Sequence, residues 1–229
     1  MHWQTSRFLI DLRTPKVMGI VNVTPDSFSD GGQYASQDAA LAHCDRLLKD
    51  GADMLDIGGE STRPGALELP VEDELARVLP IIRHAVTLGV PVSVDTYKPA
   101  VMQAALDLGA DIINDIWALR WRADGDSPTG QQVVSTHPNC GVCLMHMHRN
   151  PQTMQIAPME GDVVPQVLLF LKQLTQELRG LGVDSARICI DPGIGFGKTV
   201  QQNFALLAKQ SSLLSLGYPV LAGWSRKSS

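Results

Sequence analysis

The stretch at residues 17–32, VMGIVNVTPDSFSDGG, decides the predicted fold class. It opens with an apolar run that shows no polar alternation, which is typical of a strand buried on both faces. Such strands belong to parallel α/β proteins, in which functional groups gather at the carboxyl ends of the strands. Here the run ends at Asn22, and a loop rich in hydroxyls, carboxylates and glycine follows. The stretch therefore predicts both the fold class and the edge of the sheet that carries the site.

Strand-like runs and helical patterns alternate along the rest of the chain. The predicted strands cover residues 17–22, 54–59, 90–95, 112–116, 142–147, 187–193 and 219–225. The helical patterns between them cover residues 37–49, 71–88, 99–108, 163–181 and 200–214. Several of these helices are followed by glycine, which stops a helix at low conformational cost. Residues 120–138 are polar and contain glycine and proline, so we expect a loop with at most a short helix there.

This alternation favours a TIM (β/α)8 barrel over an open Rossmann sheet. No G-x-G-x-x-G motif follows the first strand, which also argues against a dinucleotide site. The sequence ends at Ser229, just after the seventh predicted strand. We therefore expect a single barrel domain over residues 1–229, with the eighth strand and the last helices missing from this chain.

Composition excludes several classes of protein. The 229 residues carry a formal net charge of −5, and Lys and Arg are scattered, so a nucleic-acid-binding surface is not expected. No apolar run approaches the ~18 residues of a membrane span, and the N-terminus lacks the pattern of a signal peptide. These features favour a cytoplasmic enzyme that has neither a nucleic-acid nor a membrane partner.

The cysteines and two histidines raise alternatives that the sequence disfavours. Cys140 and Cys143 form a C-x-x-C that could suggest a redox pair or half of a zinc site, but no second C-x-x-C exists. We expect reduced structural thiols. His146 and His148 form an H-x-H without a further His–Asp ligand set, so a structural or rim role is favoured over metal binding.

Polar residues follow the carboxyl end of every predicted strand. Any one of them could be a helix cap or a turn former, since Asp, Asn, Ser and Thr are preferred there. That explanation is weaker for all seven ends together, because in a barrel they converge on one mouth. The polar ends lie at Asn22, residues 60–65, 95–96, 114–115, 145–146, 191–193 and 225–227.

These residue types suit a particular ligand chemistry. Asp95 and Asp191 accept hydrogen bonds and Asn114 both donates and accepts, which suits a flat heterocycle with several N–H groups, such as an amino-pyrimidinone. Met145 and Phe196 could supply apolar walls for such a ring. Arg63 and the glycine-rich loop near Asn22 suit an anionic leaving group. No Walker A motif and no nucleophile elbow are present, and GIGFGK (193–198) is interpreted as a glycine turn over a ligand.

The motifs, taken in order, resemble a known family. They are NVTPDSFSDGG, GGESTRPGA, SVDTYKP, IINDI, CLMHM, DPGIGFGK and GWSRKS. The chain from Val17 to Ser229 resembles bacterial dihydropteroate synthase of the folate pathway. The resemblance implies a reaction between 6-hydroxymethyl-7,8-dihydropterin diphosphate and p-aminobenzoate that releases diphosphate. It also implies Mg²⁺ as cofactor, a homodimer, and competition by sulfonamides.

The resemblance further implies roles for individual residues. Residues expected to bind the substrates are Phe28, Thr62, Pro64, Asp95, Asn114, Met145, Asp191, Phe196, Lys227 and Ser228. Asp95, Asn114, Asp191 and Lys227 are expected to hold the pterin, with Met145 and Phe196 beside it. Phe28, Pro64 and Ser228 would border the p-aminobenzoate pocket. Catalytic roles fall to Asp95, Lys227 and Arg63, and Asn22 would contact Mg²⁺ or diphosphate.

The implied mechanism needs no protein nucleophile. Carbon–oxygen cleavage would leave a pterin-methyl cation that Asp95 stabilises, and the neutral arylamine would attack it. The Arg and His that the family's last strand supplies are missing here, and roles in residues 120–138 cannot be aligned. Two alternatives remain: a pterin-binding module without synthase activity, and a barrel related to corrinoid-linked methyltransferases. The loops SFSDGG and STRPG favour the synthase.

Overall fold

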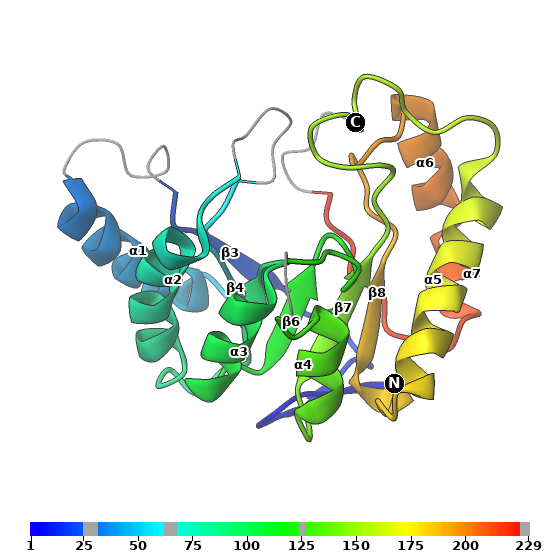
Figure 1. The fold of residues 1–229 in the computed structure, drawn as a ribbon. Coiled ribbons are helices and arrows are strands. Elements are labelled where there is room, and N and C mark those ends of the chain that lie inside the picture. The colour runs from blue at the N-terminus through cyan, green and yellow to red at the C-terminus, as the bar shows by residue number, and fades with distance from the viewer. Residues whose placement is uncertain (25–31, 62–67, 124–126, 225–229) are drawn as a thin grey trace.

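The computed structural model describes residues 1–24, 32–61, 68–123 and 127–224 (Figure 1). Its main sheet contains six parallel strands in sequential order, β3-β4-β5-β6-β7-β8. The strands are β3 (Met18–Asn22), β4 (Met54–Gly58), β5 (Val92–Asp95), β6 (Ile112–Asp115), β7 (Gly141–Met145) and β8 (Ile188–Asp191). Each matches a run that the sequence predicts, within a few residues at the ends.

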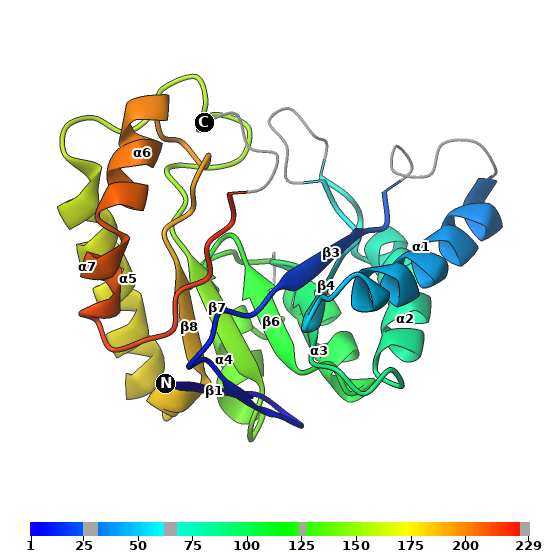
Figure 2. The same cartoon turned by 180° about the vertical axis from the view of Figure 1, so that it is seen from behind.

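The order of the strands decides between the two α/β architectures. Crossovers between parallel strands are right-handed, so an order without reversal places every connecting helix on the same face of the sheet. Figures 1 and 2 show the helices around the outside of the strands. The helices are α1 (Gly32–Lys49), α2 (Val71–Ala85), α3 (Pro99–Asp107), α4 (Gly130–Thr136), α5 (Val163–Gly180), α6 (Val200–Ala208) and α7 (Gln210–Leu214). This is the arrangement of a (β/α) barrel, and the described residues supply six of its strands.

Alternate strand residues face opposite sides of the sheet. Outward side chains such as Leu55, Val94 and Leu144 are fully or almost fully buried beneath the helices. Two apolar clusters lie there, one under α1 to α3 and one around α4 to α7. Positions on the other side of these strands, including Asp56 and Asn114, face the interior of the barrel. The outer layer thus anchors the strands, and the inner positions are left for polar groups.

One strand departs from the prediction of burial on both faces. In β3, Gly19 and Val21 are buried, whereas Ile20 is 52% exposed and Asn22 is also exposed. Among the described strands, β3 pairs with β4 alone and lies at one edge of the six-stranded sheet. The apolar run predicted the strand correctly but was wrong about its inner face.

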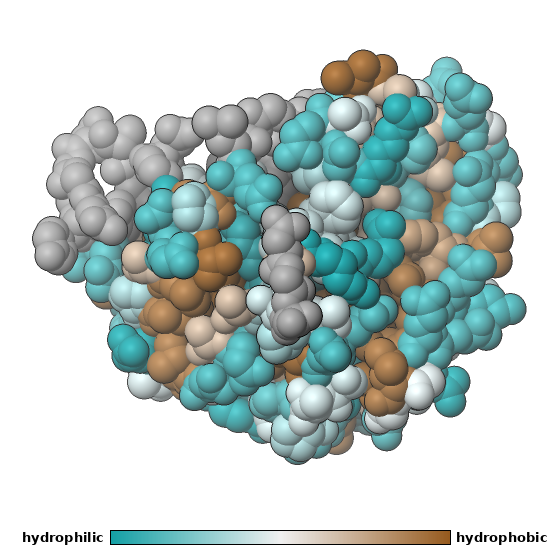
Figure 3. Space-filling view, in the orientation of Figure 1, coloured by the Kyte–Doolittle hydropathy of each residue, from teal (hydrophilic) through white to brown (hydrophobic). Residues whose placement is uncertain are grey.

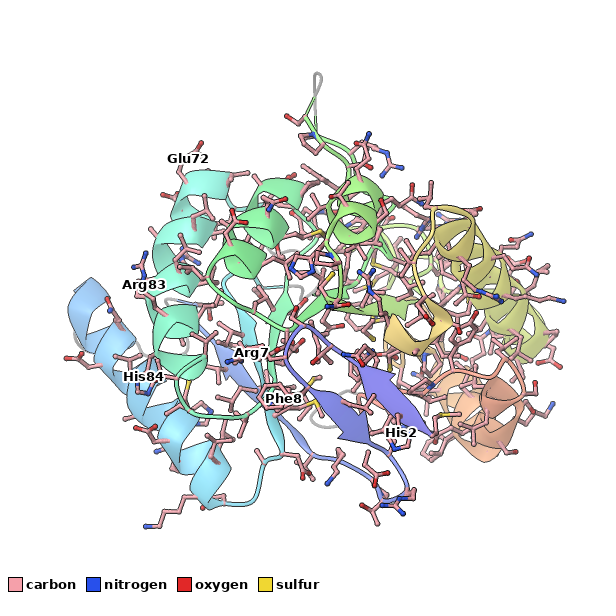
Figure 4. The ribbon with its side chains drawn as sticks, turned by 90° about the horizontal axis from the view of Figure 1, so that it is seen from below. His2, Arg7, Phe8, Glu72, Arg83 and His84 are labelled. Carbon is pink, nitrogen blue, oxygen red and sulfur yellow. The ribbon has the colours of Figure 1, made fainter. Side chains whose placement is uncertain are left out.

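A short hairpin that the sequence did not predict closes the amino end of the sheet. It consists of β1 (His2–Gln4) and β2 (Leu9–Asp11), and Trp3 and Ile10 pack against inward side chains such as Cys143. Figure 4, which looks at this end, shows Arg7 and Phe8 at the turn of the hairpin. The carboxyl ends of the strands therefore form the end at which a site can open.

The structure differs from two of the predictions for the carboxyl-terminal part of the chain. The strand predicted at residues 219–225 reduces, over its described part, to a single parallel bridge between Ile190 and Val220. Pro219 has no N–H and Gly223 weakens a strand, so the ladder stops after two backbone hydrogen bonds around Ile190. The helix predicted over 200–214 breaks at Lys209 into α6 and α7.

The structure also bears on the predictions about the cysteines and about a membrane span. All four cysteines are free and buried, as predicted for structural thiols. Polar and apolar side chains are mixed over the face drawn in Figure 3. None of the helices in the described ranges is long and apolar enough to cross a membrane.

Candidate active site

Three hydrogen-bonding residues stand at neighbouring strand ends, as the sequence predicts. Asp95 ends β5 and is the register partner of Asn114 in β6. Asp191 ends β8 and is the register partner of Met145 in β7. Asp95 and Asn114 are partly buried, and Asp191 is 4% exposed. The sheet therefore brings two carboxylates and one amide to the same mouth.

The loop after β8 is built so that Asp191 keeps its place. Its Oδ1 accepts a hydrogen bond from the Gly193 backbone N–H at 2.7 Å. Gly193 has a φ of 68°, and a Cβ there would lie 1.8 Å from the His146 carbonyl oxygen, so only glycine fits. The buried Lys198 ammonium donates to carbonyl oxygens of His146, Gly193 and Phe196. The glycine-rich segment is a close-approach turn, as predicted, and a lysine ties it to the end of β7.

The two predicted apolar walls lie in one cluster at this end of the sheet. Met145 is 4% exposed and Phe196 is 9% exposed. They share the cluster with Tyr97, Ile116, Met147 and Met154, and Trp117 and Trp121 pack against it. The side chains beside the acceptor groups are thus apolar and aromatic, which suits the face of a flat ring.

Asn114 has a partner that sequence reasoning missed. Its Nδ2 donates to Oδ2 of Asp56 at 3.1 Å, across the intervening strand β5. Asp56 is 5% exposed, and burial raises the pKa of its carboxyl above the ordinary range. The signal in the sequence was an acid inside the apolar run MLDIG, where a carboxylate requires a hydrogen-bonding partner.

A buried ionic cluster links the segments after β4 and β5. The Lys98 ammonium, 2% exposed, bonds carboxylate oxygens of Glu60 and Glu74, the latter at 2.7 Å. The Tyr97 hydroxyl donates to Glu60 Oε1 at 2.8 Å, and burial raises the pKa of that hydroxyl. Sequence reasoning missed this cluster, although Lys98 and Glu60 lie in the quoted motifs. It holds the chain next to Asp95 against the start of the segment that carries Thr62.

Asn22 stands at the end of β3 with an exposed side chain. A Cβ on Gly58 would lie 3.6 Å from Asn22 Oδ1 and 3.4 Å from Asp95 Cβ, so this glycine keeps open the space between the two residues. Nowhere in the described ranges do three His, Cys, Asp or Glu side chains gather around a possible metal position. Asn22 offers an oxygen donor at this edge of the sheet.

His146 is held inside the protein. Its ring packs edge to face on Phe170 with centroids 4.8 Å apart, and it is 5% exposed. Burial, with the nearby Lys198 charge, lowers the pKa of His146 to about 3. Burial also lowers the pKa of His148. This packing agrees with the structural role favoured for His146 from the sequence.

The remaining predicted site residues lie outside the described ranges. They are Phe28, Thr62, Arg63, Pro64, Lys227 and Ser228. Their roles stay predictions from the resemblance. The geometry of the site rests on Asn22, Asp95, Asn114 and Asp191 with the two apolar walls.

The chain is similar to known proteins along most of its length. Residues 18–229 match the family model described as pterin binding enzyme. The chain is 49% identical to the dihydropteroate synthase of Neisseria meningitidis serogroup C over 230 residues, covering 99% of this chain and 79% of that protein.

Solved structures of dihydropteroate synthases also superpose on the fold. The Burkholderia cenocepacia enzyme complexed with 7,8-dihydropteroate gives a TM-score of 0.84 at 47% identity, covering 99% of this chain and 77% of that one. The Yersinia pestis enzyme in a sulfonamide drug complex gives 0.90 at 41% identity, covering 100% and 81%. The chain belongs to the dihydropteroate synthase family of pterin-binding enzymes.

Proposed function

We propose that this chain condenses 6-hydroxymethyl-7,8-dihydropterin diphosphate with p-aminobenzoate, giving 7,8-dihydropteroate and diphosphate. The observation that carries the proposal is the set of Asp95, Asn114 and Asp191 at the carboxyl ends of three parallel strands. Such a set matches the N–H groups along the edge of a pterin ring. The family to which the chain belongs performs this condensation.

The ring binds between the acceptor groups and the apolar cluster. Asp191 receives N–H groups of the ring, because its carboxylate is held by the turn at Gly193. Met145 and Phe196 pack against the faces of the ring and exclude water from it.

The condensation then follows from charge and desolvation. The carbon–oxygen bond of the substrate breaks, and diphosphate leaves with the electron pair. The half-buried Asp95 carboxylate stabilises the positive charge left on the pterin-methyl group. The amine nitrogen of p-aminobenzoate attacks that carbon and loses one proton. Because the arylamine is itself the nucleophile, the site needs no activated serine or cysteine.

Mg²⁺ fits the chemistry of this edge. Magnesium prefers oxygen ligands and takes few from protein when phosphate oxygens are available. Asn22 would supply one oxygen, and Gly58 leaves room beside it. When bound, the ion neutralises the charge of the leaving diphosphate. A homodimer, sulfonamide sensitivity and a cytoplasmic location belong to the same proposal.

The decisive experiment measures dihydropteroate formation from the two substrates with Mg²⁺ present. We expect turnover by a version of the chain that is extended through the family's eighth strand. In Asp191→Asn we expect a roughly tenfold weaker binding of the pterin substrate by calorimetry, because one acceptor oxygen is replaced by a donor. Unchanged affinity in that variant would remove Asp191 from the ring site. Pterin binding without turnover would favour the alternative of a pterin-binding module.

A further inference from the structure

One layer below the mouth, the inner face of the sheet holds a carboxylate that the proposed reaction does not use. Asp56 lies in the middle of β4, two residues before Gly58, and is 5% exposed. Its neighbours in β4, Leu55 and Ile57, belong to the apolar layer under the helices. Asp56 therefore faces the interior of the barrel, beneath the proposed ring site.

The hydrogen bonds of Asp56 differ from those of the other buried aspartates. Asp111 accepts from Arg7 and from the Val92 N–H, and Asp115 accepts from two backbone N–H groups of the following turn. Asp56 instead receives the amide N–H of Asn114 at its Oδ2. Its Oδ1 accepts no hydrogen bond of normal length from the described residues, although the Ser93 hydroxyl, opposite it in β5, interacts with the carboxylate and lowers its pKa. Since buried polar groups are normally satisfied, a carboxylate held this way points to a role through Asn114.

We infer that Asp56 is a positioning residue that fixes the orientation of the Asn114 side-chain amide and thereby sets which hydrogen-bonding pattern the site recognises. A carboxylate oxygen accepts hydrogen bonds, so the NH₂ group of Asn114 turns toward Asp56. The carbonyl oxygen of the same amide then turns away from Asp56. The orientation holds while Oδ2 of Asp56 carries no proton, because an oxygen without a proton can only accept.

The consequence is a site whose fixed groups all accept. With the amide held in this way, Asn114 offers an oxygen beside the carboxylates of Asp95 and Asp191. Three acceptors favour a ring edge with several N–H groups over an edge that presents only acceptor atoms. Rejection is strong when a mismatch leaves buried polar groups unpaired. The inference rests on the proposed pterin function and names the residue that enforces its selectivity.

A double-mutant cycle tests this role. The Kd of 6-hydroxymethyl-7,8-dihydropterin is measured by calorimetry for the native chain, Asp56→Ala, Asn114→Ala and the double variant. We expect Asp56→Ala to raise the Kd about tenfold in the native background and less than about twofold in the Asn114→Ala background. Asp56→Asn retains an acceptor oxygen, so its loss should be smaller than that of Asp56→Ala.

Asp115→Asn is the matched control, because Asp115 is also a buried aspartate and follows Asn114 in β6. It should lower the melting temperature and leave the Kd within about twofold. If Asp56→Ala does not fold, Asp56→Leu removes the acceptor while filling the volume, and the same cycle decides. Equal losses in both backgrounds, or an unchanged Kd in Asp56→Ala, would overturn the positioning role. A native chain that does not bind the pterin would instead overturn the proposed function.

Discussion

At the scale of single residues, burial decides which side chains are charged. His146 is the clearest case, since its ring packs on Phe170 and its Nδ1 has no hydrogen-bond partner among the described residues. Burial and the neighbouring cations Lys198 and Arg120 oppose a second proton on the ring, which lowers its pKa to about 3. The folded protein therefore holds this histidine neutral at every pH at which it is expected to work.

This burial predicts a pH dependence of stability. Between pH 6.5 and about 3 the unfolded chain binds a proton on His146 that the folded chain does not bind, so stability falls as the pH falls through this window. At pH 5 the contribution is about 2 kcal/mol. We expect His146→Phe to reduce the loss of unfolding free energy between pH 7.5 and pH 5 by that order, measured by urea unfolding.

The matched control is His2→Gln, because the side chain of His2 is 53% exposed. The control should keep the pH-dependent loss of the native chain. The same loss in His146→Phe as in the native chain would contradict the assignment of this pH dependence to His146.

At the scale of elements, one ion pair ties the turn of the amino-terminal hairpin to the sheet, in addition to the packing of Trp3 and Ile10. Arg7 donates to Asp111 from Nη2 at 2.6 Å and from Nε at 3.1 Å, and its Nη1 donates to the Val86 carbonyl oxygen. The Asp111 side chain is fully buried and also accepts from the Val92 N–H. Arg7, labelled at the hairpin turn in Figure 4, is thereby joined to the start of β6 and to the segment before β5. The hairpin is thus part of the structure that closes the barrel below the site.

Breaking this pair should be costly. Arg7→Met leaves Asp111 as a buried carboxylate with only backbone donors, and we expect the unfolding free energy to fall by about 3 kcal/mol. Arg13→Met is the control, since Arg13 pairs with Asp11 on the same hairpin but its side chain is 80% exposed. That change should cost less than about 1 kcal/mol. Chemical denaturation of both variants decides, and equal losses would show that the hairpin is not anchored through Asp111.

At the scale of the whole molecule, the two apolar clusters beneath the helices and the amino-terminal hairpin pack against the strands whose carboxyl ends carry the site. Each described strand from β4 to β8 is buried on both faces apart from the partly exposed site residues Asp95 and Asn114. The four cysteines are spread over this structure, in α1, before β7, in β7 and in β8. Burial raises the pKa of Cys44 to about 11, and a hydrogen bond with Cys189 raises that of Cys143. Because these buried thiols lie in different elements, their reactivity measures how much of the fold has opened.

We expect these thiols to react only on global unfolding. In the native state, Ellman's reagent should modify none of the four cysteines within minutes, and all four should react in concentrated guanidinium. At intermediate denaturant, mass spectrometry after a short pulse of alkylation should find molecules with no label or four labels. A native population with one or two labels would show that part of the sheet opens independently.

The sequence alone determined the features that depend on local patterns. Apolar runs located the strands, glycines and periodicity located the helices, and the polar residues after each run placed Asp95, Asn114 and Asp191 at one edge. The short helix allowed for within residues 120–138 is α4, and a capping box formed by Thr129 and Gln132 marks its start. These signals extend over a few residues, and the backbone conformation they specify is decided by those residues.

Only the tertiary structure decided the pairs that join distant segments. Arg7 and Asp111 are 104 residues apart, and Asp56 and Asn114 are 58 apart. No periodicity connects such positions, since their distance depends on how the strands register and how the helices pack on them. The exposure of Ile20 in β3 also depends on tertiary structure, because the burial of a strand residue is decided by the segments that pack against it. The chain's local chemistry placed polar groups at the mouth, and packing between remote segments determined how those groups are oriented.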